Sequence, residues 1–415
     1  MFELDLIRTF AVAGLSLAAG FFIVSRVRAL ARYNVPAAVV GGLLIALLVA
    51  IAHEAELAEV KFDTSLQSTL MIAFFTSIGF SASLSLLRAG SGQALLFLAL
   101  ASFLAVMQSL VGIGVAVAFG EHPLMGVLMS STALAGGPAT ALAFAPQFAA
   151  AGVEAAESLA IAAAMAGIVL GGLAGGPIAT RLLEKHAGEP GFGVREPVLR
   201  GGTGLLMPQR ETSRAETSAA EAPSDNEETG IREILRGLTV LFVVMALGSF
   251  VSAGFVSAGL TLPGYVGAML VGALIRNIDD ATGWIRLPEA VTSQTGAVCL
   301  TLFLTIALMN LKLWELASLA LPLVVNLVLQ VTMVAIFCWW VVFRLMGRDY
   351  DAAVMSGGFT GFMLGTTANA MAVMRTIVER FGPAPRAFLV APLVGAFFID
   401  FSNALIITTF LNLLG

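Results

Sequence analysis

The feature that most constrains this chain is a series of ten long apolar runs, five on each side of one polar stretch. A helix needs about 20 apolar residues to cross a bilayer. The runs cover residues 4–24, 36–52, 66–87, 93–119 and 157–180, then 234–258, 260–275, 291–310, 316–345 and 386–412. A membrane β-barrel would instead alternate polar and apolar residues along each strand. Since 58% of the chain is hydrophobic and only 12% is charged, we predict an all-α polytopic membrane protein with ten transmembrane helices.

The polar stretch at residues 184–230 divides the chain into two halves. It is rich in Glu, Arg, Ser, Thr, Pro and Gly, a composition typical of a flexible linker. We therefore predict a first unit over residues 1–183, a linker over 184–230 and a second unit over 231–415.

The placement of Lys and Arg predicts the orientation in the membrane. If the N-terminus lies outside, only Arg8, Lys61 and Lys312 of the 22 Lys and Arg lie outside as well. Basic residues concentrate in cytoplasmic loops. This distribution predicts that both termini face out and that the central linker is cytoplasmic.

Five crossings per half would insert the second half upside down relative to the first. Weak internal similarity at a shift near 228 supports such a relation, since Gly137 aligns with Gly365 and Gly167 with Gly395. Inverted repeats are a signature of secondary transporters. The sequence therefore predicts two inverted five-helix repeats.

Two segments, 130–140 and 356–369, are apolar but interrupted by glycine, proline and hydroxyl residues. Each is predicted to be a re-entrant hairpin, because a further full crossing would spoil the charge asymmetry. Unpaired backbone at membrane depth is tolerated only where protein or a water-filled cavity surrounds it, and helix N-termini attract anions. The alternative is that the small residues simply allow helices to pack closely. The candidate substrate-binding residues are Ser131, Thr132, Gly136, Gly137, Thr140, Gly365, Thr366, Thr367 and Asn369.

Asp400 is the one acidic residue deep inside an apolar run, and Asn403 follows it by one helical turn. A carboxylate at this depth costs a few kcal/mol, so it needs a partner, a cavity or a cation. No Lys or Arg lies mid-span to pair with it. Oxygen-rich neighbours suit sodium, which makes Asp400 and Asn403 the candidate sodium-binding residues. A structural hydrogen bond and proton carriage by Asp400 are the alternatives.

The same segments resemble the bacterial glutamate:sodium symporter family. The resemblance is carried by Arg380-Phe381-Gly382-Pro383, by the segment from Ala387 to Asp400 with Asn403-Ala404-Leu405, by Tyr33-Asn34-Val35-Pro36 with Val39-Val40-Gly41-Gly42, and by Phe75-Thr76-Ser77-Ile78-Gly79-Phe80. It runs along both halves and skips the linker.

The resemblance implies ten spans, two oppositely oriented pore-loops and sodium-coupled import of L-glutamate across a bacterial inner membrane. It also implies a homodimer that works as an elevator. At the first tip the family favours Gly-Gly-any-Gly, whereas here Gly136-Gly137 is followed by Pro138-Ala139. This departure leaves aspartate or another dicarboxylate as an alternative substrate.

Other classes of function fit the sequence less well. A membrane-embedded enzyme would need a nucleophile–base pair or a metal cluster, and neither a His nor a pair of carboxylates lies mid-span. ATP-driven transport would need a P-loop, which the sequence lacks. An ion channel can share re-entrant loops but relies on rings of carbonyls or charges. No organic cofactor, no metal beyond sodium and no nucleic-acid partner is expected.

Overall fold

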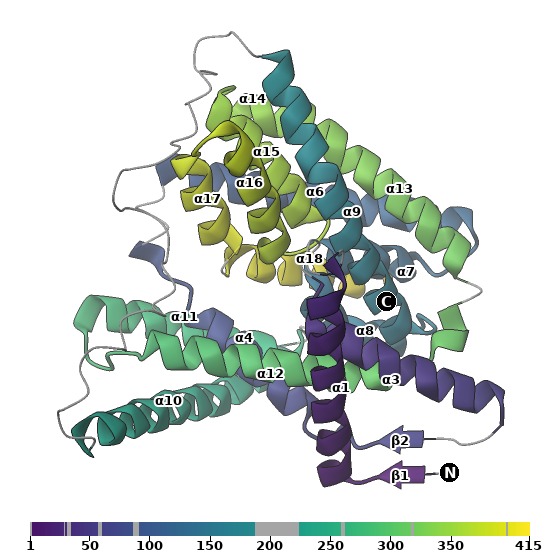
Figure 1. Ribbon diagram of the computed structural model, residues 1–415, viewed down its shortest axis with the longest axis vertical. Helices are drawn as coiled ribbons and strands as arrows, with labels where there is room; N and C mark the ends of the chain where they lie inside the picture. The colour runs from purple at the N-terminus through teal and green to yellow at the C-terminus, as the bar shows by residue number, and fades with distance from the viewer. Residues whose placement is uncertain are drawn as a thin grey trace.

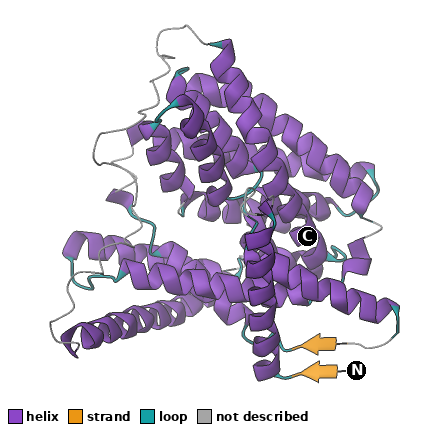
Figure 2. Cartoon of the chain, viewed as in Figure 1, coloured by secondary structure: helices purple, strands orange, loops and turns teal. Residues whose placement is uncertain are grey.

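The computed structural model of the chain describes residues 2–28, 30, 35–56, 60–85, 91–186, 224–258, 262–316, 319–395 and 397–415. The predictions that concern Arg32, Tyr33, Asn34, Arg88 and linker residues 187–223 lie outside these residues. The described chain is almost entirely helical, with one short pair of parallel strands near the N-terminus (Figure 2).

One group of helices, here called the scaffold body, comes from the first part of each half. Within it α4 packs on α11 and α12, α3 packs on α12, and the pairs α1–α3 and α10–α11 flank them. This group occupies the lower part of Figure 1. It comprises β1 (Phe2–Leu4), α1 (Leu6–Arg26), α3 (Ala37–Glu54), β2 (Val60–Phe62), α4 (Gln67–Gly79), α10 (Ser224–Ser257), α11 (Gly264–Thr282) and α12 (Glu289–Met309).

The remaining helices, here called the hairpin body, come from the second part of each half. They pack mainly on one another, and the short helix η2 (Leu313–Leu316) contacts both α3 and α9. The hairpin body comprises α6 (Ser91–Ala118), α7 (Pro123–Val127), the π-helix η1 (Leu128–Thr132), α8 (Gly137–Ala150), α9 (Ala156–Lys185), α13 (Ala320–Phe337), the π-helix η3 (Cys338–Val342), α14 (Phe343–Leu345), α15 (Tyr350–Met363), α16 (Thr367–Phe381), α17 (Pro385–Gly395) and α18 (Phe398–Leu414).

Seven helices among the described residues are long and apolar enough to cross a membrane, or eight if α17 and α18, which are bent by 45°, form one span. All ten apolar runs coincide with helices. However, α4 has 13 residues and is about 20 Å long, and α11 carries Arg276, Asp279 and Asp280 toward its end. The chain is therefore a multi-pass helical membrane protein.

The scaffold body contains two matching close contacts between helix backbones. A Cβ on Gly20 of α1 would lie 2.1 Å from the Ala37 carbonyl oxygen of α3, and one on Gly248 of α10 would lie 2.2 Å from Ala268 Cα of α11. Only glycine permits such approaches. Gly248 stands 228 residues after Gly20, so each half contains one such glycine contact between its first two long helices.

The two bodies meet through apolar side chains. Tyr265 of α11 stacks on Phe75 of α4 with ring centroids 3.8 Å apart, and Phe144 of α8 meets Tyr265 edge-on at 6.1 Å. Leu142 of α8 packs in one cluster with Leu308 of α12. These contacts between the bodies are thus made by rings and aliphatic groups.

Candidate substrate and ion site

The first predicted hairpin is a broken helix followed by a second helix. Helix α7 continues into η1, where Ser130 leaves helical geometry at φ −114° and ψ −112°. Two buried asparagines from other helices donate to backbone carbonyls beside this break. Asn326 Nδ2 donates to the Met129 oxygen at 2.9 Å, and Asn403 Nδ2 donates to the Ser131 oxygen at 3.0 Å. Helices α13 and α18 therefore hold the break in shape.

The second predicted hairpin is formed by α15 and α16, joined by a turn at 364–366. Thr366 caps α16 by accepting from the Asn369 amide. The Asn369 side chain is buried, and its Nδ2 donates to the Ile168 oxygen of α9 at 3.0 Å. This bond ties the second tip to a helix from the other half of the chain.

The two tips meet. Gly137 adopts a φ of +67°, and a Cβ there would lie 2.9 Å from Thr366 Cγ2 and 3.5 Å from the Gly365 oxygen. Helix α8 begins at Gly137 and α16 begins at Thr367, so two helix N-termini lie at this junction. Free N–H groups at helix N-termini carry partial positive charge. The junction is therefore suited to an anion.

Oxygen atoms without partners surround the two breaks. Among the described residues, Thr132 Oγ1, Asn369 Oδ1 and Asn403 Oδ1 are buried and accept no hydrogen bond. Asp400 lies in the first turn of α18, one turn before Asn403. Its side chain is partly exposed and has no hydrogen bond or ion pair within the described part of the chain. Unpaired oxygens in this number favour a cation.

The predicted site residues do not all point to one place. Gly136, Gly137, Thr140, Gly365 and Thr366 gather at the junction, where a Cβ on Gly136 would lie 2.7 Å from the Thr140 side chain.

Two of the predicted hydroxyls are used elsewhere. Ser131 Oγ bonds Ser109 Oγ of α6 at 2.7 Å. Thr367 Oγ1 donates to the Gly395 oxygen of α17 at 3.1 Å. The structure places these two side chains in supporting contacts.

Sequence reasoning overlooked three polar residues that the structure puts beside the first break. Gln108 lies on α6, and Asn326 and Gln330 lie on α13, all with no exposed surface. Uncharged amides inside apolar runs are a signal comparable to Asp400, and this signal could have identified all three residues.

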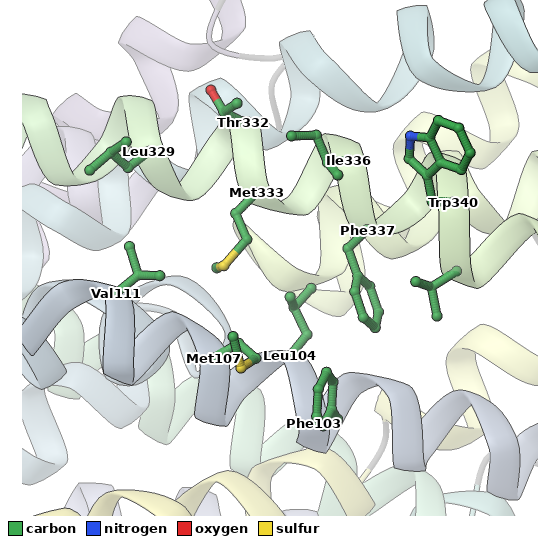
Figure 3. A pocket seen from close by; sticks show the side chains of 11 residues that line it. Phe103, Leu104, Met107, Val111, Leu329, Thr332, Met333, Ile336, Phe337 and Trp340 are labelled. Carbon is green, nitrogen blue, oxygen red and sulfur yellow. The ribbon is translucent and has the colours of Figure 1, made fainter. Parts of the chain in front are cut away.

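A separate groove of about 400 Å³ lies between α6 and α13, away from the junction. It is lined by apolar and aromatic side chains, with Thr332 as its one polar residue (Figure 3). The Thr332 hydroxyl donates to the Val328 oxygen, and the lining contains no charged residue, so this groove is not the candidate site.

A multi-pass helical protein with a polar site between two broken helical hairpins has the architecture of a secondary transporter. The family model of the sodium/glutamate symporter matches residues 2–383. The chain belongs to the sodium/glutamate symporter family, and it is thus a transporter and not an enzyme.

Two relatives illustrate this membership. The chain is 40% identical to the sodium/glutamate symporter of Escherichia coli (strain K12) over 414 residues, which are 100% of this chain and 99% of the relative. It is 37% identical to that of Haemophilus influenzae over 398 residues, which are 95% and 94% of the two chains. The alignment with the first relative includes α17 and α18, which lie beyond the match to the family model.

Proposed function

We propose that the protein imports L-glutamate together with sodium across a bacterial inner membrane. The observation that carries this proposal is the junction of the two tips, where α8 and α16 direct their N-termini toward the same place. Glutamate presents two carboxylates, and two helix N-termini supply N–H groups for them without a buried Lys or Arg. Membership in the family supports the same substrate and ion.

The substrate site in this proposal lies at the junction itself. The N–H groups of the tips and the hydroxyls of Thr140 and Thr366 are its polar contacts. Gly137 and Gly365 leave the space that the substrate needs.

The principal sodium site in this proposal comprises Asp400 and Asn403, together with Thr132, which the sequence predicted as a substrate contact. Asn403 Nδ2 is bound to the Ser131 carbonyl, which leaves its Oδ1 as a ligand. Asp400 supplies the charge, one helical turn away. Sodium requires several oxygens, and helix α18 provides them together with the broken helix η1.

Helices α4 and α11 count as short crossings in the proposed topology, which gives ten spans in two inverted repeats. The matching contacts of α1–α3 and α10–α11 support the repeat, and α7–α8 and α15–α16 are its re-entrant hairpins. The distribution of Lys and Arg supports outward termini and a cytoplasmic linker.

Alternating access in this proposal occurs by an elevator movement of the hairpin body against the scaffold body, within a homodimer. Each body packs mainly within itself, and no directional polar bond is required to break where Phe144 meets Tyr265.

The experiment that tests the function is uptake of labelled glutamate into proteoliposomes with sodium and proton gradients imposed separately. Sodium-driven accumulation that unlabelled glutamate competes away is the expected result. Accumulation driven by a proton gradient alone would show that the coupling ion is the proton and not sodium. Stronger competition by another dicarboxylate would show that glutamate is not the preferred substrate. Unitary currents in a bilayer would indicate a channel instead.

A further inference from the structure

The hairpin body contains a surplus of buried hydrogen-bond acceptors. In Gln108, Gln330, Asn369 and Asn403 the side-chain nitrogen donates to a protein oxygen, while the side-chain oxygen has no partner among the described residues. All four residues are at least 99% buried. Something that donates or carries positive charge must satisfy these oxygens, because unsatisfied buried polar atoms are costly.

Two of these residues, Gln108 and Gln330, lie against each other where α6 crosses α13. Gln330 Nε2 donates to the Gln108 backbone oxygen at 2.9 Å and to Ser130 Oγ at 3.0 Å. Gln108 Nε2 donates to the Met363 oxygen at 2.9 Å. Each glutamine therefore contacts the hairpin of the other half, and Asn326 Oδ1 completes the network by accepting from Ser130 and Gln330.

A water molecule would satisfy the unpaired Oε1 atoms of Gln108 and Gln330 less well than a cation would. A buried water makes about three hydrogen bonds and needs donors for its own lone pairs as well as acceptors for its protons. Here the amide nitrogens of Gln108 and Gln330 are already bound to protein oxygens. A cation needs only acceptors, and amide oxygens are suitable ligands for a hard cation.

We propose that Oε1 of Gln108 and Oε1 of Gln330 are two of the ligands of a second sodium ion, separate from the ion at Asp400 and Asn403. This inference rests on the proposed function as a sodium-coupled carrier. Gln330 contacts Ser130 of the broken helix η1, and Gln108 contacts the Met363 oxygen at the end of α15, so an ion bound by both glutamines would join the two hairpins. Because the site holds no carboxylate, its ion adds a full positive charge to the loaded carrier.

The test measures how sodium raises the melting temperature of the purified full-length protein, with choline replacing sodium to keep ionic strength constant. Gln108→Leu and Gln330→Leu keep similar volume but remove the oxygen. In both variants the sodium concentration for the half-maximal shift should rise about tenfold or more. Gln294→Leu, an exposed glutamine on α12, is the matched control and should leave the sodium dependence unchanged.

A buried water or a purely structural network would give a different pattern. The leucine variants would then melt at lower temperature by the same amount in choline and in sodium, and this result overturns the proposal. If the leucine variants do not fold, Gln330→Glu retains an oxygen at the site and adds a charge. Its sodium-dependent shift should exceed that of the unmodified protein, and an unchanged shift also overturns the proposal.

Uptake by the unmodified protein separates this inference from the proposed function. If that protein transports glutamate without need for sodium, the proposed function fails. If its transport requires sodium and the glutamine variants keep their sodium dependence, only the second site fails.

Discussion

At the scale of single residues, Asp400 has either a structural role or a role in coupling sodium to glutamate transport, and one substitution distinguishes the two. Replacing it with Asn keeps its shape but removes the charge that would attract sodium in the proposed site. In Asp400→Asn, the sodium concentration for half-maximal glutamate uptake should rise about tenfold or more. Glutamate affinity should fall with it, because in the proposed coupled carrier each ligand favours binding of the other by the same factor. Sodium activation curves in proteoliposomes measure both effects.

The exposed Glu154 provides the control for this change. Glu154→Gln also removes one carboxylate but leaves the α18 region intact, so its activation curve should match that of the unmodified protein. An unshifted curve for Asp400→Asn, with only reduced thermal stability, would assign Asp400 a structural role.

Gly137 is the residue on which the junction of the tips depends. A Cβ there would contact Thr366 at 2.9 Å, and its φ of +67° disfavours other residues. Gly137→Val should therefore reduce glutamate affinity more than tenfold while the protein stays folded. Binding of labelled glutamate, together with the melting temperature of the purified variant, checks this expectation.

Gly152 provides a control that distinguishes the effect of backbone strain from the loss of the glutamate site. Its φ is +95°, but a Cβ there would approach only His122, at 4.0 Å. Gly152→Val carries a comparable backbone cost far from the tips and should keep glutamate affinity. Equal affinities in the two valine variants would remove Gly137 from the binding site.

At the scale of elements, the loop between α11 and α12 is organised by one carboxylate. Asp279 Oδ1 accepts from the amides of Ile285 and Arg286, and its Oδ2 accepts from the Leu287 amide, each at 2.8 Å. Burial raises the pKa of Asp279, but the three amides and the Arg276 charge outweigh it, so its pKa lies below the usual value.

The lowered pKa of Asp279 determines how its contribution to folding stability changes with pH. The stabilisation by Asp279 is fully present above the pKa of the unfolded chain, about 3.9, and is lost as pH falls through the lower pKa of the folded protein. Asp279→Asn should lower stability by roughly 1 kcal/mol at neutral pH. The difference in melting temperature from the unmodified protein should shrink below about pH 4, and a constant difference would contradict this assignment.

The interface between the two bodies makes the proposed elevator testable at the scale of the whole molecule. We expect a cross-link between cysteines at positions 144 and 265 to abolish glutamate transport but keep glutamate binding, since it joins the hairpin body to the scaffold body. The measurement is uptake before and after a bifunctional maleimide, in a protein whose Cys299 and Cys338 are replaced by Ala.

A cross-link inside one body is the matched control. Phe75 and Tyr265 both belong to the scaffold body and stack at 3.8 Å. Cysteines at positions 75 and 265 should cross-link as readily and leave transport largely intact. Transport that survives the 144–265 cross-link would exclude relative movement of the bodies at this point.

The whole transport cycle has an electrical signature. Glutamate carries one net negative charge, and an inside-negative potential opposes its import by roughly 2.3 kcal/mol per 100 mV. With at least two sodium ions per glutamate, net positive charge moves inward. A potassium diffusion potential, inside negative, should therefore increase sodium-driven uptake, whereas indifference to the potential would rule out this stoichiometry.

The sequence by itself determined the properties that depend on transfer from water to lipid. Apolar runs of sufficient length become helices wherever the backbone must satisfy its own hydrogen bonds, and all ten predicted runs coincide with helices. Glycine in both segments, with Pro138 in the first, indicated two breaks because these residues weaken helices, although Gly357, Gly358 and Gly361 lie inside α15. Asp400 was identifiable because its charge is costly at any position in the membrane.

Only the tertiary structure decided how these pieces combine. Each body contains helices from both halves of the chain, because α4 packs on α11 and α12 rather than on its neighbours in sequence. The roles of Asn326, Gln108 and Gln330 also depend on the tertiary structure. An uncharged amide inside an apolar run has no fixed partner, and only packing against the break at Ser130 gives each of them its hydrogen bonds.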